Sequence, residues 1–219
     1  MPDGARAVLA AAAQRWDLIA GQLSPAAKGR LAVLLTGVRD GERDAARQAA
    51  LVLADELPDE FGGPQAARFA PALAGPELHV VQGEVTIGGF VADDLAALVV
   101  DGHRMVGPVL GPVRRRLLAE PAYDAGEVRQ RDEPRLIRLR GPGGRTRLPR
   151  FQFTADAVPL PVVLDANTVL GADRDPWGAA DWWLSANAWL SGGARPADLI
   201  GTADARLLDA VRLLTEDDY

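Results

Sequence analysis

Arginine is the chemically distinctive residue type in one stretch of this sequence. Residues 114–150 contain eleven arginines and five carboxylates, a net charge of +6, whereas the whole chain of 219 residues carries −6. Contacts between such basic side chains and phosphate groups supply most of the non-specific affinity of proteins for nucleic acid. The sequence therefore predicts a candidate DNA-binding region within a protein that is too acidic overall to bind nucleic acid generally.

Four of these arginines lie on or beside a predicted β-hairpin. Residues 136–151 read LIRLR-GPGG-RTRLPRF, in which two strand-like runs flank a glycine-rich turn. Side chains alternate along a strand, so Arg138 and Arg140 share a face, as do Arg145 and Arg147. We expect this wing to lie against phosphate or to enter a minor groove. There are two alternatives. The arginines could keep an edge hairpin soluble by their charge, or they could pair with acidic parts of the same chain.

Tryptophan is the second distinctive residue type, because four of the chain's five tryptophans lie between residues 175 and 201. Asp175 is a favourable N-cap and Pro176 suits a first helical turn, while Ser191-Gly192-Gly193 is a helix breaker. The sequence therefore predicts one helix that ends near Leu190.

The two faces of that predicted helix both carry tryptophan. Helical periodicity places on one broad face Trp177, Ala180, Trp183, Leu184, Asn187 and Leu190. It places Trp182 and Trp189 in a stripe on the opposite side. Because both faces must be buried, one enters the domain core, and the other requires a second layer of the chain, a second subunit or a foreign partner.

Signals for catalysis are missing from the sequence. There is no cysteine, and His79 and His103 lack metal-ligand spacing. Asp93 and Asp94 are best interpreted as a helix cap, and Asp181 as a surface residue. We find no nucleophile elbow, phosphate loop or dinucleotide fingerprint. The sequence thus predicts a protein without enzymatic activity, metal or cofactor.

The predicted fold is mainly α with a small β-hairpin part. Residues 1–60 are predicted to form a helical bundle, in which Ser24-Pro25 opens the second helix. Residues 61–76 are rich in proline and glycine and are predicted to be a linker or long loop. Residues 77–153 are predicted to be a mixed α/β region, winged-helix-like in outline, with hairpins near 78–90 and 136–151. Residues 154–219 are predicted to be a small helical domain, whose last helix Thr202 would cap.

The C-terminal part of the sequence resembles a known family. Its pattern comprises the pair Trp183-Leu184, then Asn187, Leu190, Gly192-Gly193 and the run from Pro196 to Leu199. A segment of the form Pro-x-Phe-Gln-Phe, at 149–153, precedes it. Together these elements resemble the toxin-binding domain of Xre/MbcA/ParS-type antitoxins over residues 149 to about 214. Residues 1–148 do not resemble the family's usual phage-repressor-type helix-turn-helix.

The resemblance implies a protein partner, for which a RES-type NAD⁺-degrading toxin is the candidate. We expect the partner-binding surface to include Trp182, Asn187, Trp189, Arg195 and the acidic tail near Tyr219. DNA binding by the middle region and oligomerisation through the N-terminal helices would complete an antitoxin-like or transcription-regulating protein. The alternative is a homo-oligomeric structural or scaffold protein that reuses the same helical domain. No stretch has the ~20 apolar residues of a membrane span, and we expect a cytoplasmic protein.

Overall fold

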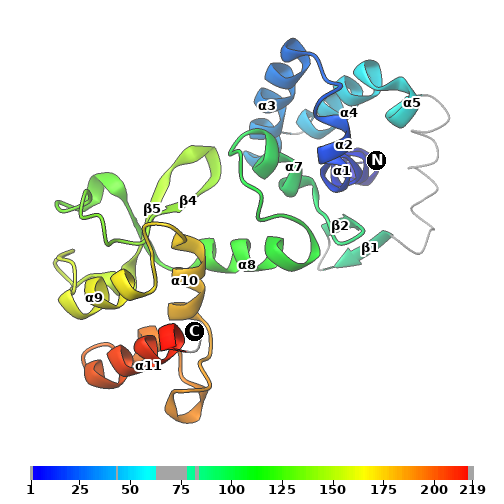
Figure 1. Ribbon diagram of the computed structural model, residues 1–219. Helices are drawn as coiled ribbons and strands as arrows, with labels where there is room; N and C mark the ends of the chain where they lie inside the picture. The colour runs from blue at the N-terminus through cyan, green and yellow to red at the C-terminus, as the bar shows by residue number, and fades with distance from the viewer. Residues whose placement is uncertain (1, 43, 63–77, 82–83, 217–219) are drawn as a thin grey trace. The chain divides into compact units, whose positions relative to one another are not determined.

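The protein is mainly helical with a small β part, as predicted from the sequence (Figure 1). The computed structural model describes residues 2–42, 44–62, 78–81 and 84–216. Residues 63–76 of the predicted linker and Tyr219 lie outside the described residues.

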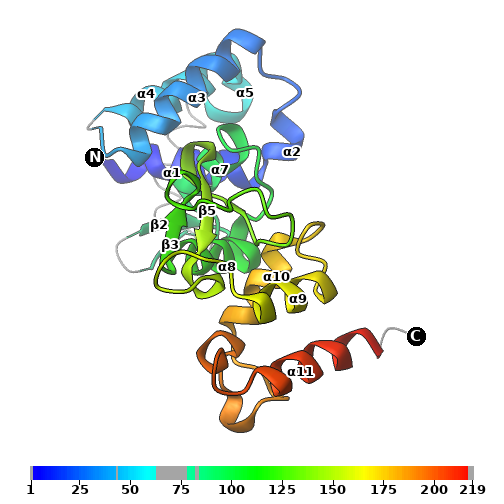
Figure 2. The ribbon, with the colours of Figure 1, turned by 90° about the vertical axis from the view of Figure 1, so that its left-hand side faces the viewer.

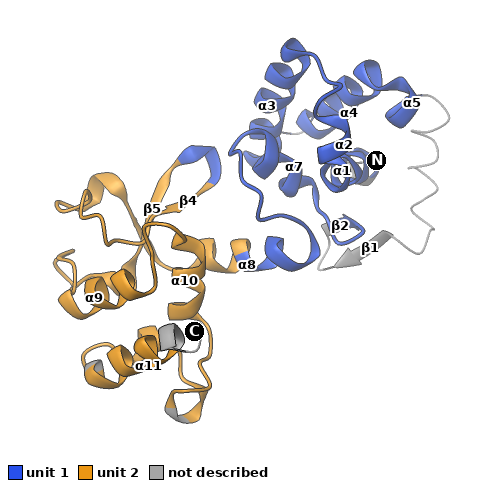
Figure 3. Cartoon of the chain, viewed as in Figure 1, with its two compact units in different colours: residues 1–113, 142–144 blue, residues 114–141, 145–219 orange. Residues whose placement is uncertain are grey.

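The contacts divide the chain into two compact units (Figure 3). Unit 1 comprises residues 1–113 and 142–144, and unit 2 comprises residues 114–141 and 145–219. The predicted middle region, 77–153, is therefore shared between the two units.

Unit 1 is a helical bundle with one β-hairpin. Its N-terminal helices are α1 (Pro2–Gln14), α2 (Trp16–Ile19), α3 (Pro25–Arg39), α4 (Ala45–Glu56) and α5 (Pro58–Phe61). The antiparallel strands β1 (Leu78–Val81) and β2 (Glu84–Ile87) follow, and then α7 (Ala92–Val99) and the first part of α8 (Gly107–Ala119). Residues 1–60 are thus helical and the first hairpin is present, and both belong to one compact unit that extends to residue 113.

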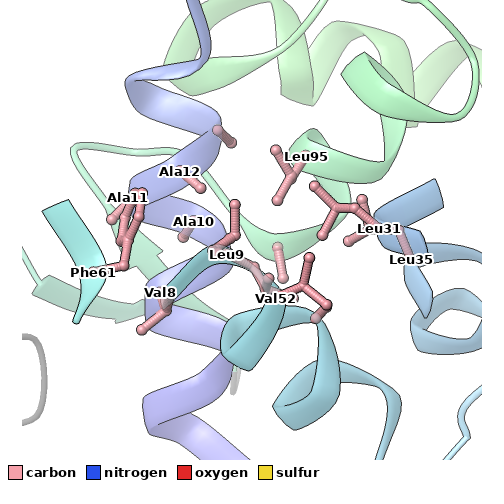
Figure 4. Close-up of a cluster of buried hydrophobic side chains, with 14 of the residues drawn as sticks. Val8, Leu9, Ala10, Ala11, Ala12, Leu31, Leu35, Val52, Phe61 and Leu95 are labelled. Atoms are coloured by element: carbon pink, nitrogen blue, oxygen red, sulfur yellow. The ribbon is translucent and has the colours of Figure 1, made fainter. Parts of the chain in front are cut away.

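Helix α1 lies at the centre of the unit 1 core. Every residue from Ala7 to Ala13 is buried, so this helix is covered on all sides over two turns. Alanine permits this arrangement because its small side chain lets neighbouring helices approach closely. Figure 4 shows Leu9 and the adjacent alanines with Leu31 of α3, Val52 of α4 and Leu95 of α7.

The caps of unit 1 follow the sequence in one case and depart from it in another. Ser24 caps α3 as predicted, because its hydroxyl accepts a hydrogen bond from the Ala27 amide at 3.1 Å. Helix α7 begins instead after Val91, so the prediction that Asp93 or Asp94 is its N-cap was wrong. Asp94 is fully buried in the first turn, where its carboxylate accepts from the amides of Val91 (3.1 Å) and Gly107 (3.2 Å). This carboxylate therefore fixes the start of α7 and the start of α8 together.

Unit 2 contains a three-stranded antiparallel sheet. Its strands β3 (Ala122–Asp124), β5 (Thr146–Pro149) and β4 (Leu139–Arg140) lie in that order. Strands β4 and β5 form the predicted hairpin, and β3 was not foreseen. After β3 the chain forms the single 3₁₀ turn η2 (Ala125–Glu127).

The helices of unit 2 follow the sheet. They are α9 (Pro161–Val169), α10 (Pro176–Leu184), the 3₁₀ turns η5 (Ser191–Gly193) and η6 (Pro196–Leu199), and α11 (Asp204–Glu216). Helix α11 packs against α9 and against η6 (Figure 2). Thr202 does not cap α11 as predicted, because its hydroxyl donates to the Leu199 carbonyl at 3.0 Å.

Candidate protein-binding site

The tryptophan helix is shorter than the sequence predicts. Asp175 caps α10 as expected, accepting from the Gly178 amide at 2.9 Å, but the helix ends at Leu184 and not near Leu190. The predicted stripe of Trp182 and Trp189 on one helix face was therefore wrong. Trp189 lies in the loop that follows α10, and Trp182 lies edge-on against Trp183 with ring centroids 5.1 Å apart.

An arginine holds the end of α10 in place. Arg116 donates to the Leu184 carbonyl at 3.2 Å and pairs with the Asp181 carboxylate. The Ser185 hydroxyl donates to the same carboxylate at 3.0 Å, and Ser185 itself has an extended backbone. These side chains satisfy groups that a helix terminus otherwise leaves unpaired, so α10 stops here. Asp181, expected to be a plain surface residue, thus has a structural role.

A buried polar network fixes the other side of α10. The indole of Trp183, which is fully buried, donates to the Asn167 side-chain oxygen at 2.8 Å. The Asn167 amide donates to the Gln152 side-chain oxygen at 3.2 Å and to the Arg135 carbonyl at 2.9 Å. Gln152 also exchanges hydrogen bonds with the backbone of Ile137 at 2.7 and 3.1 Å. Three separate segments are thereby joined to α10.

The loop after α10 is organised by Asn187. Its side-chain oxygen accepts a hydrogen bond from the backbone amide of Trp189 at 2.9 Å. The backbone amide of Asn187 donates to the Ala194 carbonyl at 3.1 Å. Asn187 is buried, so these hydrogen bonds hold the loop on its inner side. Trp189, whose amide is held by Asn187, has 63% of its surface exposed.

Arg195 is engaged within unit 2. It makes a two-pronged ion pair with Asp198, at 3.0 and 2.9 Å, and a third bond to Glu120 at 3.1 Å. Hydrogen bonding from Arg195 lowers the pKa of Asp198 below its ordinary value, and the same pair raises the pKa of Arg195. The guanidinium thus joins the η6 turn to the end of α8.

Replacing Arg195 by Gln is expected to weaken the folded state in a pH-dependent way. Because the folded pKa of Asp198 is lowered, the pair stabilises the protein above the unfolded pKa, about 3.9, and this contribution is lost as pH falls through the folded value. The pair is partly exposed, so we expect a loss of at most about 1 kcal/mol at pH 7 and none in strong acid. Urea unfolding of both proteins from pH 2 to 7 measures this; a constant difference across that range would refute the assignment.

A groove of about 330 Å³ lies between the loop carrying Trp189 and helix α11. Its apolar lining includes Trp189, Leu199, Ala203 and Leu213, and the charged residues Arg206 and Asp209 border it. Leu213 is 44% exposed in addition to the exposed indole of Trp189. The groove therefore presents two large apolar side chains beside one cation and one anion.

The arginines of the basic hairpin do not share one surface. Arg147 lies opposite Leu139 and Arg140 lies opposite Thr146, so Arg140 and Arg147 project from opposite faces of the sheet. Arg138 donates to the backbone carbonyls of Leu136 at 3.2 Å, Glu133 at 2.7 Å and Arg131, and so fastens the preceding loop. Arg140 and Arg145 are exposed.

Of the two histidines, the structure describes the side chain of His103 and not that of His79. His103 accepts a hydrogen bond from the Met105 amide at 3.0 Å. Among the described residues, no group of three or more histidine and carboxylate side chains is placed to hold a metal ion. No helix in the described part of the chain is both long and apolar enough to cross a membrane.

Comparison with protein-family models, with curated proteins and with solved structures finds no match to this chain.

The sequence indicated tryptophan on two surfaces but grouped Trp182 with Trp189 on one helix face, and the contributions of Asn167, Gln152 and α11 were missed. Gln152 stood in the Pro-x-Phe-Gln-Phe segment, which is a positional signal only. A polar residue within the apolar α9 sequence PVVLDANTV was the available signal for Asn167.

Proposed function

We propose that this protein is a non-enzymatic binding protein that holds an apolar segment of a protein partner in the Trp189 groove. The observation that carries the proposal is the exposed indole of Trp189, which is 63% exposed although Asn187 fixes the loop on which it lies. Tryptophan is enriched among the interface residues that dominate binding free energy. The supporting loop needs little ordering on binding, which reduces the entropic cost.

The composition of the groove suits a partner segment with one or two large apolar side chains. Its volume of about 330 Å³ is at the lower end of the range of roughly 300–1,000 Å³ for ligand pockets. Arg206 and Asp209 at its border would orient the partner through charge. Asn187 and Arg195 support this surface from within unit 2, so Trp189 and Leu213 are the side chains we expect to touch the partner.

The finer proposal is an antitoxin-like role, with a RES-type NAD⁺-degrading toxin as the partner. It is supported by the sequence resemblance of residues 149–214 and by the groove within the same segment. A regulatory role in transcription belongs to the same proposal and requires DNA binding as well. A homo-oligomeric scaffold is the alternative, in which the groove serves only self-association.

The test is capture of the partner from native extract by the full chain at low salt, with half of the extract treated with nuclease. We expect one protein recovered in stoichiometric amount from both halves, identified by mass spectrometry. Recovery of DNA alone, or of the chain alone, would overturn the partner-binding proposal.

DNA binding through the hairpin is a second proposal, narrowed by the geometry to Arg140 and Arg145. These are the exposed members of the predicted set, whereas Arg138 is engaged with backbone carbonyls. Replacing both Arg140 and Arg145 by Ala should weaken binding to duplex DNA and reduce the slope of log K against log salt by about 2. Arg30→Ala, an exposed arginine of unit 1, is the control. A salt slope equal to that of the wild type would exclude this hairpin.

A further inference from the structure

We propose that a second copy of this chain covers the Trp189 groove, with the two α11 helices packed antiparallel about a two-fold axis. This inference rests on the groove assigned above as the partner site and names what occupies it in the isolated protein. The exposed face of α11 that borders the groove carries Arg206, Asp209 and Leu213. These residues recur at spacings of three and four, so they form one stripe along the helix.

The charges of Arg206 and Asp209 are self-complementary, and Asp209 also forms an exposed ion pair within its own helix, in which its Oδ1 lies 3.7 Å from Nη1 of Arg212. Arg206 and Asp209 are separated by about 4.5 Å along the helix, from the rise of about 1.5 Å per residue. A two-fold axis midway between them brings Arg206 of one copy level with Asp209 of the other, and the reverse pair forms by symmetry. A parallel arrangement would instead place like charges level with each other, which is unfavourable. The observed order of charges therefore selects the antiparallel pairing.

The apolar residues of the groove match in the same register. Ala203 directly precedes α11, and the axis that pairs Arg206 with Asp209 brings this start of one helix close to the level of Leu213 in the other. Ala203 is small and Leu213 is large and 44% exposed, so the leucine enters the space beside the alanine. Trp189, on the other wall of the groove, then packs against the second α11. Both exposed apolar side chains of the groove are covered in this way.

Self-association of this kind regulates the groove. The second copy occupies the surface that a foreign partner requires, so one partner molecule must displace it. Partner binding is then in competition with self-association, and the apparent affinity for the partner falls as the concentration of the chain rises.

Charge reversal in the full chain tests the pairing, measured by sedimentation velocity over a concentration series. We expect a dimer for the wild type, and at least about tenfold weaker self-association for Arg206→Asp and for Asp209→Arg, since each variant places like charges opposite each other. An equimolar mixture of these two variants should recover a heterodimer, because both opposite-charge pairs form again. The double variant R206D/D209R should likewise recover the homodimer.

Asp173→Arg, a charge reversal at an exposed residue of the turn after α9, is the control and should leave the dimer unchanged. Circular dichroism confirms that each variant is folded. A monomeric wild type, or single reversals that self-associate as strongly as the wild type, would overturn this inference. Neither of those results bears on capture of a foreign partner, so failure of the dimer and failure of the proposed function are distinguishable.

Discussion

Replacing Asn167 by Leu is expected to destabilise unit 2 by about 3–5 kcal/mol. The two side chains have similar size, so the loss arises from hydrogen bonds that cannot be made. The substitution leaves the Trp183 indole and the Arg135 carbonyl without their partner, and each bond is at 2.8–2.9 Å in the wild type. A buried polar group left unsatisfied costs about 1–3 kcal/mol. Denaturant unfolding followed by tryptophan fluorescence reports the change, because four of the five tryptophans belong to unit 2.

A double-mutant cycle separates this hydrogen bond from simple loss of packing. Trp183→Phe removes the indole donor while keeping an aromatic ring beside Phe151, whose ring centroid lies 5.2 Å from that of Trp183. In the double variant the leucine no longer faces an unpaired donor. We therefore expect the double variant to lose at least about 1 kcal/mol less unfolding free energy than the sum of the losses of the two single variants. Strict additivity of the two changes would show that the Trp183–Asn167 bond does not contribute as described.

Replacing Trp189 by Ser is expected to weaken binding of the captured partner by about 2 kcal/mol or more, which is about thirtyfold. The fold should be preserved, because the indole is 63% exposed and the Trp189 amide can still donate to Asn187. We expect the free energy of unfolding to change by less than about 0.5 kcal/mol. Titration of the purified partner by calorimetry, at chain concentrations that keep self-association low, measures the affinity.

The matched control for Trp189 is Val158→Ser, which removes another exposed apolar side chain of unit 2 outside the groove. This variant should bind the partner as the wild type does. Equal affinities of the wild type and Trp189→Ser for the partner, or an equal loss of affinity in both variants, would show that the groove is not the binding site.

Local signals in the sequence predicted many of the helix starts and the hairpins. Ser24-Pro25 and Asp175-Pro176 each combine a capping side chain with a first-turn proline, and both helices begin there. The Gly-Pro-Gly-Gly segment at 141–144 likewise connects two paired strands, with Gly143 and Gly144 at positive φ. These features depend on neighbouring residues, so sequence alone carries the information.

The features that failed depend on contacts between distant segments. Helical periodicity extended α10 to Leu190, but Arg116, 68 residues earlier in the chain, binds the carbonyl of Leu184 at the helix end. Arg138 and Arg145 lie outside the two strands, so the predicted alternation does not apply to them, and only the register between β4 and β5 shows that Arg140 and Arg147 face opposite ways. Neither the contact of Arg116 nor the pairing of the two strands can be recognised in the local sequence pattern.

The candidate site shows the same division. The sequence indicated that tryptophans of 175–201 serve two surfaces, and the structure places Trp183 in the core and Trp189 on the groove. It could not indicate that Arg195 is engaged by Asp198 and Glu120, because charge alone does not distinguish a binding arginine from a structural one. The contribution of α11 was missed, because its exposed face forms one wall of the groove only when the Trp189 loop lies beside it.

Amide hydrogen exchange of the full chain, with and without its purified partner and at chain concentrations that keep self-association low, tests partner binding in the groove most directly. The account predicts slower exchange on binding in residues 187–213, which include the Trp189 loop and the exposed face of α11, and no change in residues 25–56 of unit 1. Protection confined to unit 1 or to the hairpin at 139–149, with exchange in 187–213 unaltered, would contradict it.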